Sequence, residues 1–172
     1  MKKPFLPNDY GPRVAAILGD GQRLMPLGPG IPVSSMRMAI RDFDPESDLG
    51  SVLNREAAFA CMAGLWLYWD FLDEAHTISQ DLHTPEGSAW HAIVHRREPD
   101  AWNSNYWWDR AGNASWMADA GYDSPKLFVE ECERVRGRGN HDEMTAIGTQ
   151  LKEWQSLFDH CYRLAVSGSK LR

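Results

Sequence analysis

The C-terminal part of the chain carries the pattern that most constrains the fold. Between Asn140 and Gly168, apolar side chains recur every three or four residues, at Met144, Ile147, Leu151, Trp154, Leu157, Phe158, Cys161 and Leu164. This spacing puts them on one face of a long α-helix, which Asn140 and Gly168 are expected to bracket. No segment combines strict alternation with β-branched residues, as a half-buried strand does. We therefore predict an all-α fold of about six helices in a single domain.

The body of the chain, residues 44–172, is expected to form helical hairpins closed by this long helix. A capping side chain stands directly before a proline at Asp44-Pro45, Thr84-Pro85 and Ser124-Pro125. The side-chain oxygen accepts a hydrogen bond from an unpaired backbone N–H, and proline fits the first helical position because no N–H is needed there. Each pair therefore predicts a helix start. Pro99 and Gly112 are predicted to end helices.

Residues 1–43 are predicted to form an irregular N-terminal arm. Residues 18–32 are so rich in glycine and proline that neither a helix nor the interior of a sheet is expected there. The arm also carries apolar side chains, namely Leu24, Met25, Leu27, Ile31 and Val33. Because the apolar arm and the eight tryptophans exceed what a small helical body buries, we predict a homodimer in which residues 4–33 contact the partner subunit. An arm packed wholly on its own chain is the alternative.

Composition argues against two classes of partner. The chain of 172 residues is long enough for one core, and its net charge of −6 comes with no long basic run, so no nucleic-acid partner is expected. The most apolar run, residues 57–69, is shorter than the roughly 20 residues that span a bilayer. We therefore expect this run to be a buried core helix, and no membrane partner.

The cysteines and the first residues bear on the compartment of the cell. Cys61, Cys132 and Cys161 are odd in number, widely separated and set among apolar residues, which is typical of reduced core thiols. The opening MKKPFLPNDYGP has no apolar segment of the kind found in secretory leaders. We therefore expect a cytoplasmic protein.

Residues 90–112, WHAIVHRREPDAWNSNYWWDRAG, form the densest group of polar and aromatic side chains in the chain. They match no catalytic or cofactor signature whose spacing dictates a reaction. The candidate ligand-binding residues are His91, His95, Arg96, Arg97, Glu98, Asp100, Asn103, Tyr106 and Trp107. We expect any functional site to lie in this block.

Residues 70–112 resemble the central block of a group of bacterial proteins, with more distant fungal relatives, that share a histidine, Arg-Arg-Glu, Asp, Asn and Tyr-Trp pattern. Here the pattern falls on His95, Arg96, Arg97, Glu98, Asp100, Asn103, Tyr106 and Trp107. The arm is similar too, so the resemblance covers most of the chain. The group is all-helical and has no assigned activity, so the resemblance implies a fold and no reaction. The hairpins also loosely resemble tetratricopeptide hairpins, which implies architecture alone.

Two rows of polar side chains have the spacing of metal ligands. One row lies on the helix predicted from Pro85 and consists of His91, His95 and Glu98. The other lies on the preceding predicted helix and consists of Asp73, His76, Gln80 and His83. Side chains three or four residues apart share one face of a helix, so an antiparallel hairpin could bring the two rows together.

These histidines have two alternative roles. The candidate ligands of a divalent metal are His76, His83, His91 and His95, with Glu98 as a candidate general base. The alternative is that the histidines are hydrogen-bonded or solvated. The chain has neither the glutamate of an H-E-x-x-H helix nor a Glu-x-x-His pair, which favours this alternative. We therefore expect the histidines to diverge into solvent.

Arg96 and Arg97 also have two interpretations. At a helix end they could bind a carboxylate or phosphate group beside an aromatic surface. That surface, a candidate floor for a ring or a sugar, consists of Trp102, Tyr106 and Trp107. Alternatively, Arg97 lies on the packed face of its helix and pairs with Asp100 or Asp109, which we favour. Asp100 and Asn103 are expected to cap the next helix.

The sequence therefore favours a non-catalytic binding or interaction protein with a polar and aromatic cleft around residues 91–107. Its expected ligand is a small anionic or sugar-like molecule. The alternative is a metal-dependent enzyme built on the histidines of the hairpin. No cofactor other than that divalent metal is implied.

Overall fold

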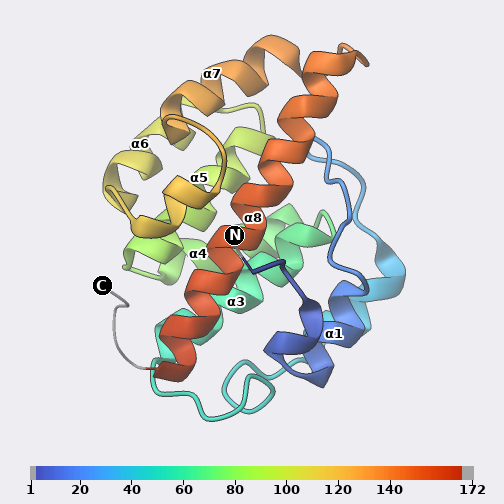
Figure 1. Cartoon of the computed structure of the whole chain (residues 1–172), viewed down its shortest axis with the longest axis vertical. Helices are drawn as coiled ribbons and strands as arrows, with labels where there is room; N and C mark the ends of the chain where they lie inside the picture. Colours follow the sequence, from blue (N-terminus) through green and yellow to red (C-terminus); the bar gives the residue numbers. More distant parts are fainter. Residues whose placement is uncertain (1–2, 168–172) are drawn as a thin grey trace.

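The structure, a computed structural model, describes residues 3–167. These residues contain helices and no strand, so the prediction of an all-α fold is confirmed. The α-helices are α1 (Pro12–Leu18), α2 (Arg37–Arg41), α3 (Arg55–Tyr68), α4 (Leu72–Asp81), α5 (Pro85–Arg97), α6 (Ala101–Ala111), α7 (Pro125–Val135) and α8 (His141–Ser167) (Figure 1). Short 3-10 helices span Pro7–Tyr10, Ser34–Met36 and Ser115–Asp119. The predicted helices of the body correspond to α3 through α8.

Several helix ends lie where the sequence predicts them. Thr84 caps α5 and Ser124 caps α7, each accepting a hydrogen bond from the backbone N–H three residues further on. Asn140 does the same at the start of α8. Helix α5 ends just before Pro99, and α6 ends at Gly112. Gly168, the predicted end of α8, lies outside the described residues.

The helix start predicted at Asp44 is wrong. Its carboxylate accepts hydrogen bonds from the backbone N–H of Glu46 and the hydroxyl of Ser47, so it closes a local turn. The chain then continues as turns until α3 begins at Arg55, where Asn54 provides the cap. The physical reason is that a short acidic side chain stabilises turns and helix starts through the same hydrogen bond.

The long helix α8 lies along α3, and α3, α4, α5 and α6 pack against one another in sequence order (Figure 1). Gly64 allows α3, α5 and α8 to meet closely. A Cβ atom at this position would lie 2.8 Å from the ring of Trp90 on α5. The indole N–H of Trp154 on α8 donates to the Gly64 carbonyl oxygen at 2.9 Å. These three helices therefore share one tightly packed core, in line with the dense packing of protein interiors.

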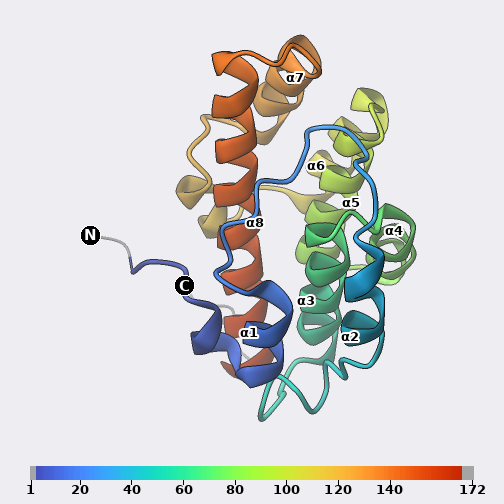
Figure 2. The same ribbon diagram turned by 90° about the vertical axis from the view of Figure 1, so that its right-hand side faces the viewer.

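The arm differs from the prediction in two stretches. The prediction of an irregular chain is wrong at residues 12–18, which form α1, and at residues 37–41, which form α2. Between these helices the arm runs past α8 toward α5 and α6 and returns beside α3 (Figure 2). Its apolar side chains join the core of their own chain; the buried ones include Tyr10, Val14, Ile17, Leu18, Met25 and Leu27.

Packing of the arm on its own chain is the alternative that the sequence analysis set beside a homodimer. Burial of the arm against its own helices accounts for much of the apolar excess, whereas Leu24 and Ile31 stay exposed. The homodimer remains a prediction, and light scattering at micromolar protein concentration tests it.

The three cysteines lie in the interior of the protein. All three are buried and none forms a disulfide, as predicted for core thiols.

Within residues 3–167, no helix is both long enough and apolar enough to cross a membrane.

Candidate functional site

The connection between α4 and α5 sets how closely these helices approach. A Cβ atom at Gly87 would lie 2.4 Å from the carbonyl oxygen of Leu82, which is closer than non-bonded atoms come. Only glycine fits at this position, and its small size lets the first turn of α5 rest on the end of α4. The polar faces of the two helices therefore meet.

Three histidines converge where these faces meet, and we call them the histidine cluster: His76 from α4, and His91 and His95 from α5. One ring nitrogen from each can be chosen so that all three nitrogens lie within 4.8 Å of one another. The Nε2 atoms of His76 and His91 are 3.0 Å apart, so one imidazole donates a hydrogen bond to the other. The expected divergence into solvent is therefore wrong.

His83 does not belong to the cluster, although its spacing from His76 suggested that it would. Helix α4 ends at Asp81, so the chain has left the helical path before it reaches His83. The side chain of His83 is exposed at the connection to α5. Helical spacing predicts a shared face only while the helix continues.

His91 is the buried member of the histidine cluster. Only 3% of its surface is exposed, and the ring of Trp107 stacks on it with 3.9 Å between the ring centroids. Its Nδ1 atom has no hydrogen-bond partner among the described residues. Burial, and then the nearby charges of His76 and His95, lower the pKa of His91 to about 3. The imidazole is therefore neutral at physiological pH, which is the form that binds metals.

His95 contacts a carboxylate on its outer side. Its Nδ1 atom lies 3.0 Å from Oε2 of Glu98, although the carboxylate is not in line with the ring N–H. A carboxylate that accepts a hydrogen bond from Nδ1 would favour the tautomer that presents Nε2 to a metal, but this contact lacks that alignment. Glu98, a candidate base from the sequence, therefore lies beside His95 without fixing its tautomer.

The spacing of the histidine cluster can be compared with that of a zinc site. In a tetrahedral site with Zn–N bonds of about 2.0–2.1 Å, two ligand nitrogens are about 3.3 Å apart. The two Nε2 atoms that are 3.0 Å apart nearly meet this requirement. The widest pair lies within 4.8 Å, so it would have to shorten by up to about 1.5 Å to reach this spacing. The three imidazoles therefore suit a small divalent ion.

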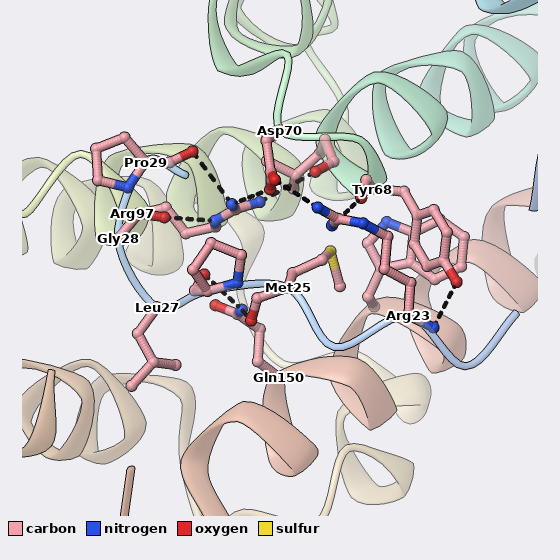
Figure 3. Close-up of polar contacts among 12 residues, drawn as sticks. Arg23, Met25, Leu27, Gly28, Pro29, Tyr68, Asp70, Arg97 and Gln150 are labelled. Carbon is pink, nitrogen blue, oxygen red and sulfur yellow. Dashed lines mark hydrogen bonds and ion pairs between the residues drawn. The ribbon is translucent and has the colours of Figure 1, made fainter. Parts of the chain in front are cut away.

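Arg97 lies in the core rather than at a binding surface (Figure 3). It pairs with Asp70 at 2.5 Å and donates to the backbone carbonyl oxygens of Leu67 and Gly28, each at 3.0 Å. The predicted pairing with Asp100 or Asp109 is wrong, because Asp70 holds this guanidinium. Sequence spacing offered no signal for it, since Asp70 follows the end of α3 in a left-handed conformation with φ 66°.

Arg96 is buried on the other side of the same helix end. Its guanidinium donates to Oε1 of Glu153 at 2.9 Å and stacks over the ring of Phe128. Neither Arg96 nor Arg97 is exposed to an external ligand, and both tie α5 to other parts of the chain.

The acidic and amide candidates lie at the start of α6. Asp100 accepts hydrogen bonds from the backbone N–H and the side-chain amide of Asn103, so Asp100 is the cap and Asn103 supports it. Asp109 pairs with Lys126 at 2.5 Å.

The aromatic residues of the block face two directions. Trp102 and Tyr106 lie on the outer face of α6, exposed by 75% and 45%, with their rings nearly parallel and their centroids 6.1 Å apart. Trp107 instead points inward onto His91. The candidate floor for a ring is therefore split between the surface and the histidine cluster.

A small hollow of about 260 Å³ adjoins the histidine cluster. It is lined by Leu82, His83, Thr84, Pro85, Ser88, Trp107 and Arg110. Trp107 contacts both, because its side chain lines the hollow and stacks on the ring of His91. A larger hollow of about 880 Å³ lies between the first described residues, the 3-10 helix Ser115–Asp119 and α8. No member of the histidine cluster lines either hollow, but the small one is lined by Trp107, which stacks on His91, and is therefore the one we relate to the site.

Comparison with known proteins adds no further constraint. No protein-family model, curated protein or solved structure matches the chain.

Proposed function

We propose that this protein binds a divalent transition-metal ion at His76, His91 and His95 and offers it an open coordination position for an external ligand. The observation that carries the proposal is the convergence of three ring nitrogens within 4.8 Å from two adjacent helices. Burial keeps the central imidazole neutral, which removes the cost of displacing a proton from it on metal binding.

The ligand set selects the class of metal. Imidazole suits zinc, copper, nickel and iron, whereas magnesium and calcium prefer oxygen ligands. Three protein ligands leave a fourth position of a tetrahedral ion for water or another molecule, which is the arrangement of catalytic rather than structural zinc. Trp107 supports the orientation of His91 by stacking on its ring, and the carboxylate of Glu98 lies 3.0 Å from Nδ1 of His95.

Metal analysis tests this function directly. Protein prepared without a histidine tag is loaded with Zn²⁺, dialysed, and analysed for metal by mass spectrometry. We expect one ion per chain, and a loss of that ion in His95→Gln. The matched control is His83→Gln, which removes a histidine of the same hairpin outside the histidine cluster. Equal metal contents in the two variants, or no stoichiometric metal in the parent protein, would reject the proposal.

A second candidate function is a non-catalytic binding surface on α6. It is supported by the exposed parallel stack of Trp102 and Tyr106, because such a stack suits the flat face of a sugar-like ring. Titration with a cello-oligosaccharide, followed by the indole N–H signal of Trp102 in NMR spectra, tests it. A shift that disappears in Tyr106→Ala supports this surface, and no shift in the parent protein rejects it.

A further inference from the structure

We infer that the small hollow beside the histidine cluster receives the carboxylate or phosphate group of a small ligand, held by Arg110, while the ligand reaches the metal. This inference rests on the proposed function, since it names the class of ligand that the open coordination position accepts. Four features of the site support it: the charge of the centre, the state of Arg110, the position of the hollow next to the histidine cluster, and the size of the hollow.

The charge of the metal centre favours an anion. The three ligands are imidazoles, which bind metals in their neutral form, so they leave both positive charges of a divalent ion uncompensated. The carboxylate of Glu98 lies 3.0 Å from Nδ1 of His95 and is not one of the three ligand groups. An anionic fourth ligand therefore gains attraction from the ion in a partly buried site, where water screens charges less.

Arg110 provides a second positive charge at the hollow. No carboxylate among residues 3–167 forms an ion pair with it, and the adjacent Asp109 pairs instead with Lys126 at 2.5 Å. The guanidinium carbon lies 5.3 Å from the ring centroid of Trp107 and 5.8 Å from that of Tyr106. The two rings support a cation that is not neutralised, and an arginine fork is well matched to carboxylate and phosphate oxygens.

The hollow and the histidine cluster lie next to each other. Trp107 lines the hollow and stacks on His91 of the cluster. Ser88 lines the hollow and lies on α5 three residues before His91 and seven before His95, so all three share one face of the helix. A ligand that enters beside Arg110 and Ser88 therefore approaches the ion along the same helix face.

The size of the hollow limits the ligand. A volume of about 260 Å³ lies at the lower end of the range for small-molecule sites. His83, which lies outside the histidine cluster, also lines this hollow and offers a further donor to an anion. A small carboxylate or phosphate compound fits these dimensions.

Cobalt substitution tests the inference. The protein is loaded with Co²⁺, whose visible absorption reports its ligands, and metal content is measured first. Inorganic phosphate and succinate are then titrated in separate arms, with affinity measured by calorimetry. We expect at least one of them to change the cobalt spectrum, and to bind at least tenfold more weakly to Arg110→Gln. The arm that responds identifies the kind of oxyanion.

The matched control is Arg55→Gln, because Arg55 is another exposed arginine stacked over an aromatic ring, that of Phe59. It should bind the anion like the parent protein, and both variants should retain one Co²⁺ per chain. Equal anion affinities for the two variants, anion binding without a spectral change, or no anion binding to the loaded protein would each overturn the inference while leaving metal binding intact. Absence of cobalt binding in the parent protein would reject both proposals.

Discussion

Arg97 and Asp70 form an ion pair at 2.5 Å that is almost completely removed from solvent. The other carboxylate oxygen of Asp70 pairs at 2.6 Å with Arg23 of the arm, so one acidic side chain joins the arm to α5. Burial lowers the pKa of Arg97 to about 10, against the opposing effect of Asp70. Arg97 is therefore still charged at neutral pH, and each member of the pair depends on the other.

Replacing Arg97 by Ala should destabilise the fold by about 3 kcal/mol or more, because it leaves a buried carboxylate without its main partner. Urea denaturation measures the loss. Arg41→Ala removes an exposed arginine and should change stability by less than about 0.5 kcal/mol. A nearly unchanged stability of Arg97→Ala would instead favour a ligand-binding role for this guanidinium.

Replacing Gly87 by Ala should destabilise the protein by about 2 kcal/mol or more, because the new Cβ collides with the backbone of Leu82. The hairpin should also open, so that metal affinity falls. Gly148→Ala is the control: nothing lies within 4 Å of that Cβ in the middle of α8, and alanine should stabilise the helix by about 0.5–1 kcal/mol. Equal effects of the two substitutions would contradict the close contact.

Zinc should stabilise the folded protein, because an ion that binds only the folded state shifts the equilibrium toward it. At a free concentration one hundred times Kd, the gain is about 2.7 kcal/mol. Thermal unfolding with and without Zn²⁺ measures it, and EDTA should reverse it. The gain should vanish in His76→Gln and persist in His83→Gln. A zinc effect of the same size in both variants would point to adventitious binding.

Stability of the metal-free protein should fall in acid because of His91. Its pKa is about 3 in the folded state, against about 6.5 for a histidine in an unfolded chain, so between these values only the unfolded chain takes up the proton. The contribution is complete above pH 6.5 and is lost as pH falls toward 3, at up to about 1.4 kcal/mol per pH unit. Urea unfolding in EDTA at pH 7, 6 and 5 should show a shallower dependence for His91→Gln than for the parent protein. Parallel curves would show that His91 is accessible to protons in the folded state.

The sequence was sufficient for several structural features that depend on neighbouring residues. Thr84 and Ser124 start helices because the cap and the bonded N–H are three residues apart, and the face of α8 follows from its own periodicity. Helix α1 has comparable signals, with Pro12 at its start and Gly19 at its end. The abundance of glycine and proline just beyond it obscured them.

Structural features that depend on residues far apart in the chain could not be predicted from the sequence. The histidine cluster forms between two helices whose connection is tightly packed at Gly87 and Leu82, and spacing along either helix does not reveal this packing. Asp70, the partner of Arg97, lies in another hairpin, and its polarity alone did not distinguish it from the nearer Asp100. The candidate residues were therefore found more readily than their partners.

The arm has a consequence for the order of folding. Without helix or strand of its own between residues 19 and 33, it finds partners for its carbonyl groups on side chains of other elements, including Arg97 of α5 and Gln150 of α8. The bond from Gln150 to Met25 spans 125 residues of chain. The arm is synthesised before α8, so it acquires this partner only after α8 has been made. The stretch between residues 19 and 33 therefore depends, for its final conformation, on a helix that follows it by more than one hundred residues.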